Sequence, residues 1–153
     1  MKKRCLRSYE QGRIGKDTLL ITPLTFMNNS GAIFRYASIA SYKSKDIIVV
    51  CDTLDLPSGY IRIKKGGSSA GHNGLKSLME YLDSPDFIRI YIGIGRPKAP
   101  QTVVEYVLSA PIGEQEQDSL HEGIEKATMA VTDLINNIPL EEVIRAYNRK
   151  VSP

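Results

Sequence analysis

The sequence predicts an α/β fold, with a single domain over residues 1–153 and a mixed central β-sheet flanked by helices. Short apolar runs typical of strands alternate along the chain with segments of helical periodicity. Two of the predicted strands are joined by only a short turn, which indicates an antiparallel pair and therefore a mixed sheet. A chain of 153 residues is long enough to bury one substantial core.

The first half of the chain supplies the strands that define the sheet. Residues 17–23 form a short apolar strand, and residues 25–31 follow as a polar turn. Residues 32–42 place apolar side chains at helical spacing, which predicts an amphipathic helix. Residues 46–52 are an almost continuous apolar run, typical of a strand buried on both faces. Residues 60–65 alternate apolar and polar side chains, which predicts a strand paired antiparallel with that run.

The second half of the chain is mostly helical. Residues 74–82 and the terminal residues 140–150 predict helices, and residues 87–95 predict another strand. Residues 102–111 fit a short helix or a strand equally well. Residues 113–137 predict the longest helix. Its apolar stripe consists of Leu120, Ile124, Ala127, Val131, Leu134 and Ile135.

Composition and charge exclude several classes of protein. No apolar run is long enough to span a membrane, and the basic start MKKRCLRS leads into no apolar segment, so it is not a secretory signal. The two cysteines, Cys5 and Cys51, give neither a disulfide framework nor a metal pattern, which predicts a reducing cytoplasm and no metal. A net charge of +3 does not by itself indicate nucleic-acid binding.

The stretch KKGGSSAGHNGLKS, Lys64–Ser77, is the most informative loop. It lacks the Gly-Lys-Ser/Thr ending of a P-loop, and the later GIGRPK has Lys98 where a dinucleotide fingerprint needs glycine, so no nucleotide cofactor is expected. Small residues lead instead into a helix N-terminus, where backbone N–H groups favour oxyanions and carbonyls. Asn73, at the N-cap or just before it, adds an amide. The sequence therefore leaves two interpretations of this loop open: a binding site and a simple helix cap.

His72 is a candidate general base, because imidazole titrates near the working pH. Such a base needs an orienting carboxylate, and Asp52 or Asp55 could supply it at the end of a strand, where sites gather in α/β folds. A turn cap is the alternative role for Asp52. His121 lies in a polar helical stretch and is expected to be solvated.

The turn TFMNNSG is a second candidate part of a site. Asn28 and Asn29 could cap the helix that follows. Phe26 and Met27 are expected either in the core or beside a pocket. Paired with the glycine-rich loop, these residues could line one cleft.

Three stretches together resemble the bacterial-type peptidyl-tRNA hydrolase family. They are PLTFMNNSG, CDTLDLPSGYIRIKKGGSSAGHNGLKS and FIRIYIGIGRP, in this order, and the resemblance covers essentially the whole chain. The resemblance implies an α/β enzyme that hydrolyses the ester joining a peptide to the 3′ end of tRNA. It also implies a cytoplasmic monomer without a cofactor, whose partner is peptidyl-tRNA, contacted at the acceptor end and the 5′ phosphate.

The resemblance also implies roles for individual residues. Asn28 and Asn73 match asparagines that hold the substrate, and Phe26 matches an aromatic position in the same binding set. Asp52 matches the aspartate that orients and stabilises the catalytic histidine. His72 matches a histidine that lines the cleft and is not the principal base.

The expected tRNA contacts lie in the glycine-rich loop and the strand before it. Lys64 matches a lysine that meets the tRNA 5′ phosphate, and Lys65 is a further candidate for tRNA binding. Where the family often has an arginine partner for that phosphate, this sequence has Tyr91. Arg89 and Lys65 are the candidates to compensate.

One departure concerns the start of the chain. The family's GNPG…TRHN-like segment, which supplies the catalytic histidine, does not occur in this sequence. We therefore expect an N-terminal segment, including one strand, to be missing. Three hypotheses follow: an ordinary hydrolase whose first segment is absent from this sequence, a non-catalytic RNA-binding relative, or an inactive fragment. A fourth has His72 replacing the base, with Asp52 as its partner.

Overall fold

The computed structural model describes residues 8–98, 101–109 and 113–148, and the chain divides into two compact units. One, which we call the hairpin unit, combines Met1–Ile47 with Gly66–Phe87. The other, the sheet unit, combines Ile48–Lys65 with Ile88–Pro153. Each unit is described by itself below.

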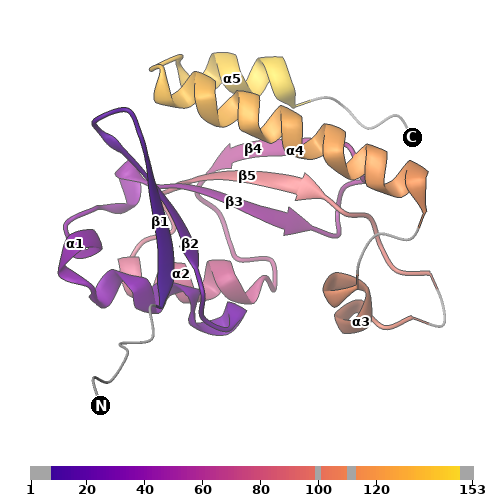
Figure 1. Cartoon of the computed structure of the whole chain (residues 1–153), viewed down its shortest axis with the longest axis horizontal. Helices are drawn as coiled ribbons and strands as arrows, with labels where there is room; N and C mark the ends of the chain where they lie inside the picture. The colour runs from indigo at the N-terminus through magenta and orange to yellow at the C-terminus, as the bar shows by residue number, and fades with distance from the viewer. Residues whose placement is uncertain (1–7, 99–100, 110–112, 149–153) are drawn as a thin grey trace. The chain divides into compact units, whose positions relative to one another are not determined.

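The sheet unit contains a mixed three-stranded sheet, which confirms the predicted α/β class (Figure 1). Its strands are β3 (Ile48–Thr53), β4 (Ile61–Lys65) and β5 (Ile88–Gly93). Their order is β3-β5-β4, with β5 parallel to β3 and antiparallel to β4. The prediction that β3 and β4 pair directly is therefore wrong. The short turn between them reverses the direction of the chain. However, β5, which comes later in the sequence, lies between β3 and β4 and pairs with both.

The outer strand β3 is less buried than its sequence suggests. The apolar run predicts burial on both faces, yet Val50 in the middle of β3 is 47% exposed. Among the described strands of this unit β3 lies at the edge of the sheet, so it has a strand neighbour on one side only. An apolar run alone does not distinguish an edge strand from a central one.

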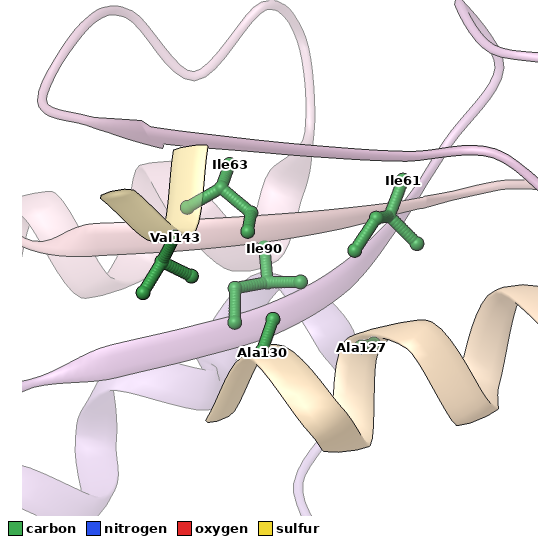
Figure 2. Close-up of a cluster of buried hydrophobic side chains, with 6 residues drawn as sticks. All are labelled: Ile61, Ile63, Ile90, Ala127, Ala130 and Val143. Carbon is green, nitrogen blue, oxygen red and sulfur yellow. The ribbon is translucent and has the colours of Figure 1, made fainter. Parts of the chain in front are cut away.

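Helices of the sheet unit build its core on one side of the sheet. The helices α4 (Glu114–Ile135) and α5 (Leu140–Tyr147) contact β5 and β4. The buried cluster between them, shown in Figure 2, consists of Ile61, Ile63, Ile90, Ala127, Ala130 and Val143. Each fully buried isoleucine or valine stabilises the fold by roughly 1.5–3 kcal/mol. Of the predicted stripe on α4, Ala127 is buried, but Ile124 is 45% exposed, so that assignment is wrong.

The segment whose type the sequence left open is a short helix, α3 (Val103–Leu108). Thr102 and Glu105 form a capping box at its start, each side chain bonding to the backbone N–H of the other. The two bonds that Glu105 accepts from Thr102 lower the pKa of its carboxyl group. The capping box decides between helix and strand here.

The side chain of Asn148, just after α5, covers part of the outer edge of β4. Its Oδ1 accepts a hydrogen bond from the Ile63 N–H at 2.7 Å, and its Nδ2 donates to the Ile63 carbonyl at 2.9 Å. Because β4 lies at the edge of the described sheet, these backbone groups have no ladder partner there. The amide therefore takes the place of a neighbouring strand at this point.

The hairpin unit begins with an antiparallel pair of strands, β1 (Tyr9–Ile14) and β2 (Thr18–Pro23). The sequence predicts β2 but not β1. Five of the six residues of β1 are exposed, so β1 lacks the apolar alternation that marks a strand. Gly15 has a φ of 63° in the connecting turn, a conformation that favours glycine.

Four helical segments complete the hairpin unit. They are η1 (Met27–Arg35), which consists of 3₁₀ segments joined at a kink at Asn29, α1 (Ala37–Ala40), the 3₁₀ turn η2 (Ser44–Asp46) and α2 (Asn73–Leu82). The helix α2 confirms its prediction. The polar turn expected before residue 32 is wrong, because helical structure begins earlier, at Met27, and breaks at Tyr36, which has extended backbone.

In the described part of the chain, no helix is long and apolar enough to cross a membrane.

Candidate functional site

The segments η1 and α2 approach each other closely within the hairpin unit. The Gly31 N–H donates a hydrogen bond to Ser77 Oγ at 2.9 Å. A Cβ atom at Gly31 would overlap the carbonyl oxygen of Ser77 and lie 2.6 Å from Tyr81 Cδ2. A Cβ atom at Gly74 would lie 2.6 Å from Met27 Sδ. Gly31 is therefore needed for steric reasons, because a side chain there would meet the backbone of α2, whereas at Gly74 the neighbouring atom belongs to the flexible Met27 side chain.

The contacts show that η1 and α2 run in the same direction. Met27 lies against Gly74 at their beginnings, and Gly31 bonds to Ser77 one turn later. At the far end the Arg35 guanidinium lies 5.1 Å from the centroid of the Tyr81 ring. Because the contacts advance along both segments together, the N-termini of η1 and α2 lie at the same end.

This alignment brings two of the predicted site residues to one end of the hairpin unit. Asn28 is the second residue of η1, and Asn73 is the first residue of α2. Both are exposed, and each adjoins a residue of the Met27–Gly74 contact. Amide groups that donate and accept hydrogen bonds thus combine with the positive end of α2, a setting that suits a carbonyl or an oxyanion.

His72 is the N-cap of α2, one residue before the predicted cap. Its Nδ1 accepts a hydrogen bond from the Leu75 N–H at 3.3 Å, while Asn73 is already helical. The prediction that Asn73 caps the helix is therefore wrong. The lone pair of Nδ1 is therefore engaged in capping the helix.

Phe26 immediately precedes η1, and its side chain is almost fully exposed, at 88%. Met27 is 55% exposed. The expectation that these residues belong to the core is wrong, and the alternative, a place beside a binding surface, stays a prediction. Phe26 offers a free aromatic face next to Asn28.

Asp52 belongs to the sheet unit, near the end of β3, where its Cα is in register with Ile92 of β5. The preceding Cys51 is a half-buried free cysteine. Burial, with a smaller effect from the Asp52 charge, raises the pKa of its thiol to about 12. Cys51 is therefore a thiol and not a nucleophilic thiolate at neutral pH. His72 and Asp52 lie in different units, and the fourth hypothesis, that they act together, stays untested.

The candidate tRNA contacts lie on two neighbouring strands of the sheet unit. Lys64 on β4 is half-buried, with its Nζ 5.6 Å from the centroid of the Tyr91 ring on β5. Arg89 is fully buried and donates from Nη1 to Tyr91 Oη at 3.3 Å. Lys65 is exposed. A buried guanidinium does not face solvent, so Lys65 is the more accessible of the two proposed substitutes for the family's arginine.

Other titratable groups of the described residues lie outside this arrangement. His121 is exposed on α4, with its Nε2 3.3 Å from Glu125 Oε1, which confirms the expectation of a solvated side chain. The described residues contain no group of three or more His, Cys, Asp or Glu side chains that could hold a metal ion.

Sequence reasoning did not identify the residues that align the two asparagines. Gly31, Gly74 and Ser77 lie in stretches that the sequence analysis singled out, but as small residues they have no chemistry that would identify them as packing contacts. The signal that could have found them is their spacing. Gly31 follows Asn28 by three residues, across the kink at Asn29, and Ser77 follows Asn73 by one α-helical turn.

Comparisons with known proteins agree on one family. The family described as Peptidyl-tRNA hydrolase matches residues 1–153. The peptidyl-tRNA hydrolase of Bacillus subtilis is 41% identical over 138 residues, which cover 90% of this chain and 72% of that protein. That of Aquifex aeolicus is 41% identical, with 89% and 70% covered.

Comparison with solved structures indicates the same family. A crystal structure of a peptidyl-tRNA hydrolase in complex with N-propanol superposes with a TM-score of 0.75 at 31% identity, covering 92% of this chain and 72% of that chain. The enzyme of Acinetobacter baumannii gives a TM-score of 0.74 at 32% identity, with 90% and 71% covered.

The fold and the comparisons define a hydrolase, and the chain belongs to the peptidyl-tRNA hydrolase family. We expected an N-terminal segment and strand to be missing. The family match runs from residue 1 to residue 153 and gives this expectation no support. The alternatives of a non-catalytic relative and an inactive fragment find no support in the comparisons either.

Proposed function

We propose that this protein hydrolyses the ester bond between the peptide and the tRNA of peptidyl-tRNA, releasing tRNA for reuse in translation. Family membership supports the reaction class. The observation that carries the assignment of the site is the parallel packing of η1 on α2, which places the exposed amides of Asn28 and Asn73 at one end. An ester flanked by peptide groups offers the carbonyls and N–H groups that such amides bind.

Asn28 and Asn73 hold the peptidyl end of the substrate in this proposal, and Phe26 contacts the same part of it. Attack of water on the ester carbonyl develops negative charge on the carbonyl oxygen. The positive end of α2 stabilises that charge. His72 contributes to substrate binding as a residue that lines the same end of the unit, with its Nδ1 engaged in capping α2.

By the resemblance, Asp52 is the residue that would orient a histidine base. The sequence has two histidines, His72, which caps α2, and His121, which is solvated on α4, so we assign the role of general base to neither and propose only the orienting role of Asp52. Lys64 and Lys65 contact the tRNA 5′ phosphate. We further propose that the protein works as a monomer in the cytoplasm and without a cofactor.

The test is a hydrolysis assay with an N-acetylated aminoacyl-tRNA, measuring release of the acylated amino acid. We expect Asn28→Ala and Asn73→Ala each to lower kcat/KM by roughly tenfold or more, because each removes a hydrogen bond to the substrate. The matched control is Gln117→Ala, which removes an exposed amide from α4 in the sheet unit and should leave turnover unchanged.

Two results would overturn the proposal. Salt-dependent tRNA binding without any ester cleavage would define an RNA-binding protein without catalysis. Cleavage that is equally fast in both asparagine variants would leave the reaction but remove these residues from the site.

A further inference from the structure

We infer that Ser77 is a positioning residue, which sets the spacing between the side chains of Asn28 and Asn73. The inference rests on the function proposed above, in which these two asparagines hold the substrate. Ser77 is only 3% exposed, so it acts through the backbone of η1 and not by touching the substrate.

The hydrogen bond that Ser77 accepts fixes the position of η1 along the axis of α2. Its Oγ accepts the Gly31 N–H at 2.9 Å, in a buried bond between segments that are 46 residues apart. Because Gly31 has no side chain, its backbone lies directly against the carbonyl of Ser77. A shift of η1 along α2 would break this hydrogen bond and bring the two backbones into conflict.

The Gly31–Ser77 bond lies close to both asparagines in the chain. In α2, Ser77 follows Asn73 by four residues, about one helical turn. In η1, Gly31 follows Asn28 by three residues, across the non-helical backbone of Asn29, which has a φ of −124° and a ψ of 17°. Only a short stretch of chain therefore separates this bond from each amide, and a change at the bond moves the two amides relative to each other.

A second contact supports the same alignment on the other side of the asparagines. Met27 precedes Asn28, Gly74 follows Asn73, and Met27 Sδ lies against Gly74. The Met27 contact is apolar and adaptable, since methionine side chains tolerate repacking. The hydrogen bond to Ser77 is directional, so it provides the more exact constraint.

The test separates positioning from simple stabilisation by comparing KM with kcat. We expect Ser77→Ala to raise KM for peptidyl-tRNA roughly fivefold to twentyfold with kcat changed less than about threefold, because substrate binding and not chemistry is impaired. The control is Ile63→Val, which removes a methyl group from the buried cluster of the sheet unit and lowers stability. It should lower Tm and leave KM unchanged.

A direct readout does not depend on activity. In ¹⁵N-edited NMR spectra, the side-chain amide signals of both Asn28 and Asn73 should move in Ser77→Ala and stay in place in Ile63→Val. If Ser77→Ala does not fold, Ser77→Cys keeps only a weak acceptor at the same position, and the amide signals of both asparagines should still move away from their wild-type positions.

Each result decides one question. Unchanged KM and unchanged asparagine signals in a folded Ser77 variant would overturn the positioning role and leave the proposed function intact. If the wild-type chain cleaves no peptidyl-tRNA, the proposed function fails, and the NMR signals still show whether Ser77 sets the spacing of the two amides.

Discussion

At the scale of single residues, His72 shows how a chemically suggestive side chain can have a structural role. An imidazole in a glycine-rich loop suggests a base, but its Nδ1 accepts the Leu75 N–H and caps α2. The sequence shows that an imidazole lies near the start of the helix. It does not show that this imidazole caps the helix as a hydrogen-bond acceptor, because capping depends on a one-residue difference in where the helix begins.

Substituting His72 separates its cap from any chemical role. His72→Ala should lower the free energy of unfolding by about 1 kcal/mol through loss of the cap, whereas His72→Asn retains an acceptor and should recover most of it. Urea unfolding measures both. In the hydrolysis assay His72→Asn should keep kcat within about tenfold of the wild type. A stable His72→Asn variant with no turnover would instead make His72 part of the chemistry.

At the scale of elements, the strands and long helices were predictable because their own side chains form their pattern. The apolar runs of β3 and β5 and the helical period of α4 identify these elements without reference to any neighbour. The polar strand β1 is held by pairing with β2, and η1 is held by contacts to α2. Their structure comes from partners distant in sequence, which a local pattern does not contain.

The two hydrogen bonds between the Asn148 side chain and the Ile63 backbone connect the end of α5 to β4, and we expect their loss to lower stability. Asn148→Ala leaves the backbone N–H and carbonyl of Ile63 without their partner, and should lower the free energy of unfolding by about 1–3 kcal/mol. Amide hydrogen exchange at Ile63 should become faster in the variant. Asn148→Asp keeps the acceptor for the N–H but sets an oxygen against the carbonyl, so it should recover only part of the loss. Unchanged exchange at Ile63 would show that these two hydrogen bonds do not protect the Ile63 N–H.

At the scale of the whole molecule, the proposed roles are distributed over both units. Asn28, Asn73 and His72 belong to the hairpin unit, and Asp52 and Lys64 belong to the sheet unit. The sequence alone predicted the α/β class and identified these residues as candidates for a site. The alignment of the asparagines was not, because it depends on Ser77 and Gly31, which have no chemistry of their own to attract notice.

Binding of tRNA is a property of the whole molecule, and its salt dependence tests the proposed phosphate contact. Lys64→Ala should weaken binding and reduce the slope of log Kd against log salt concentration by about one, as expected for the loss of one phosphate contact. Fluorescence anisotropy over a salt series measures the slope. Lys16→Ala, which removes an exposed lysine from the β1–β2 turn, should leave it unchanged. An unchanged slope in Lys64→Ala would argue against the phosphate contact.

The bond from Asn148 to Ile63 also bears on the order in which the chain assembles during synthesis. It joins residues 85 positions apart, so β4 waits for its edge partner until most of the chain has left the ribosome. The hairpin unit contains no residue beyond Phe87. Since segments made earlier generally fold first during synthesis, we expect η1 and α2 to be able to align while the ribosome is still translating α4 and α5. In that order of events, Asn28 and Asn73 reach their places before the sheet unit is complete.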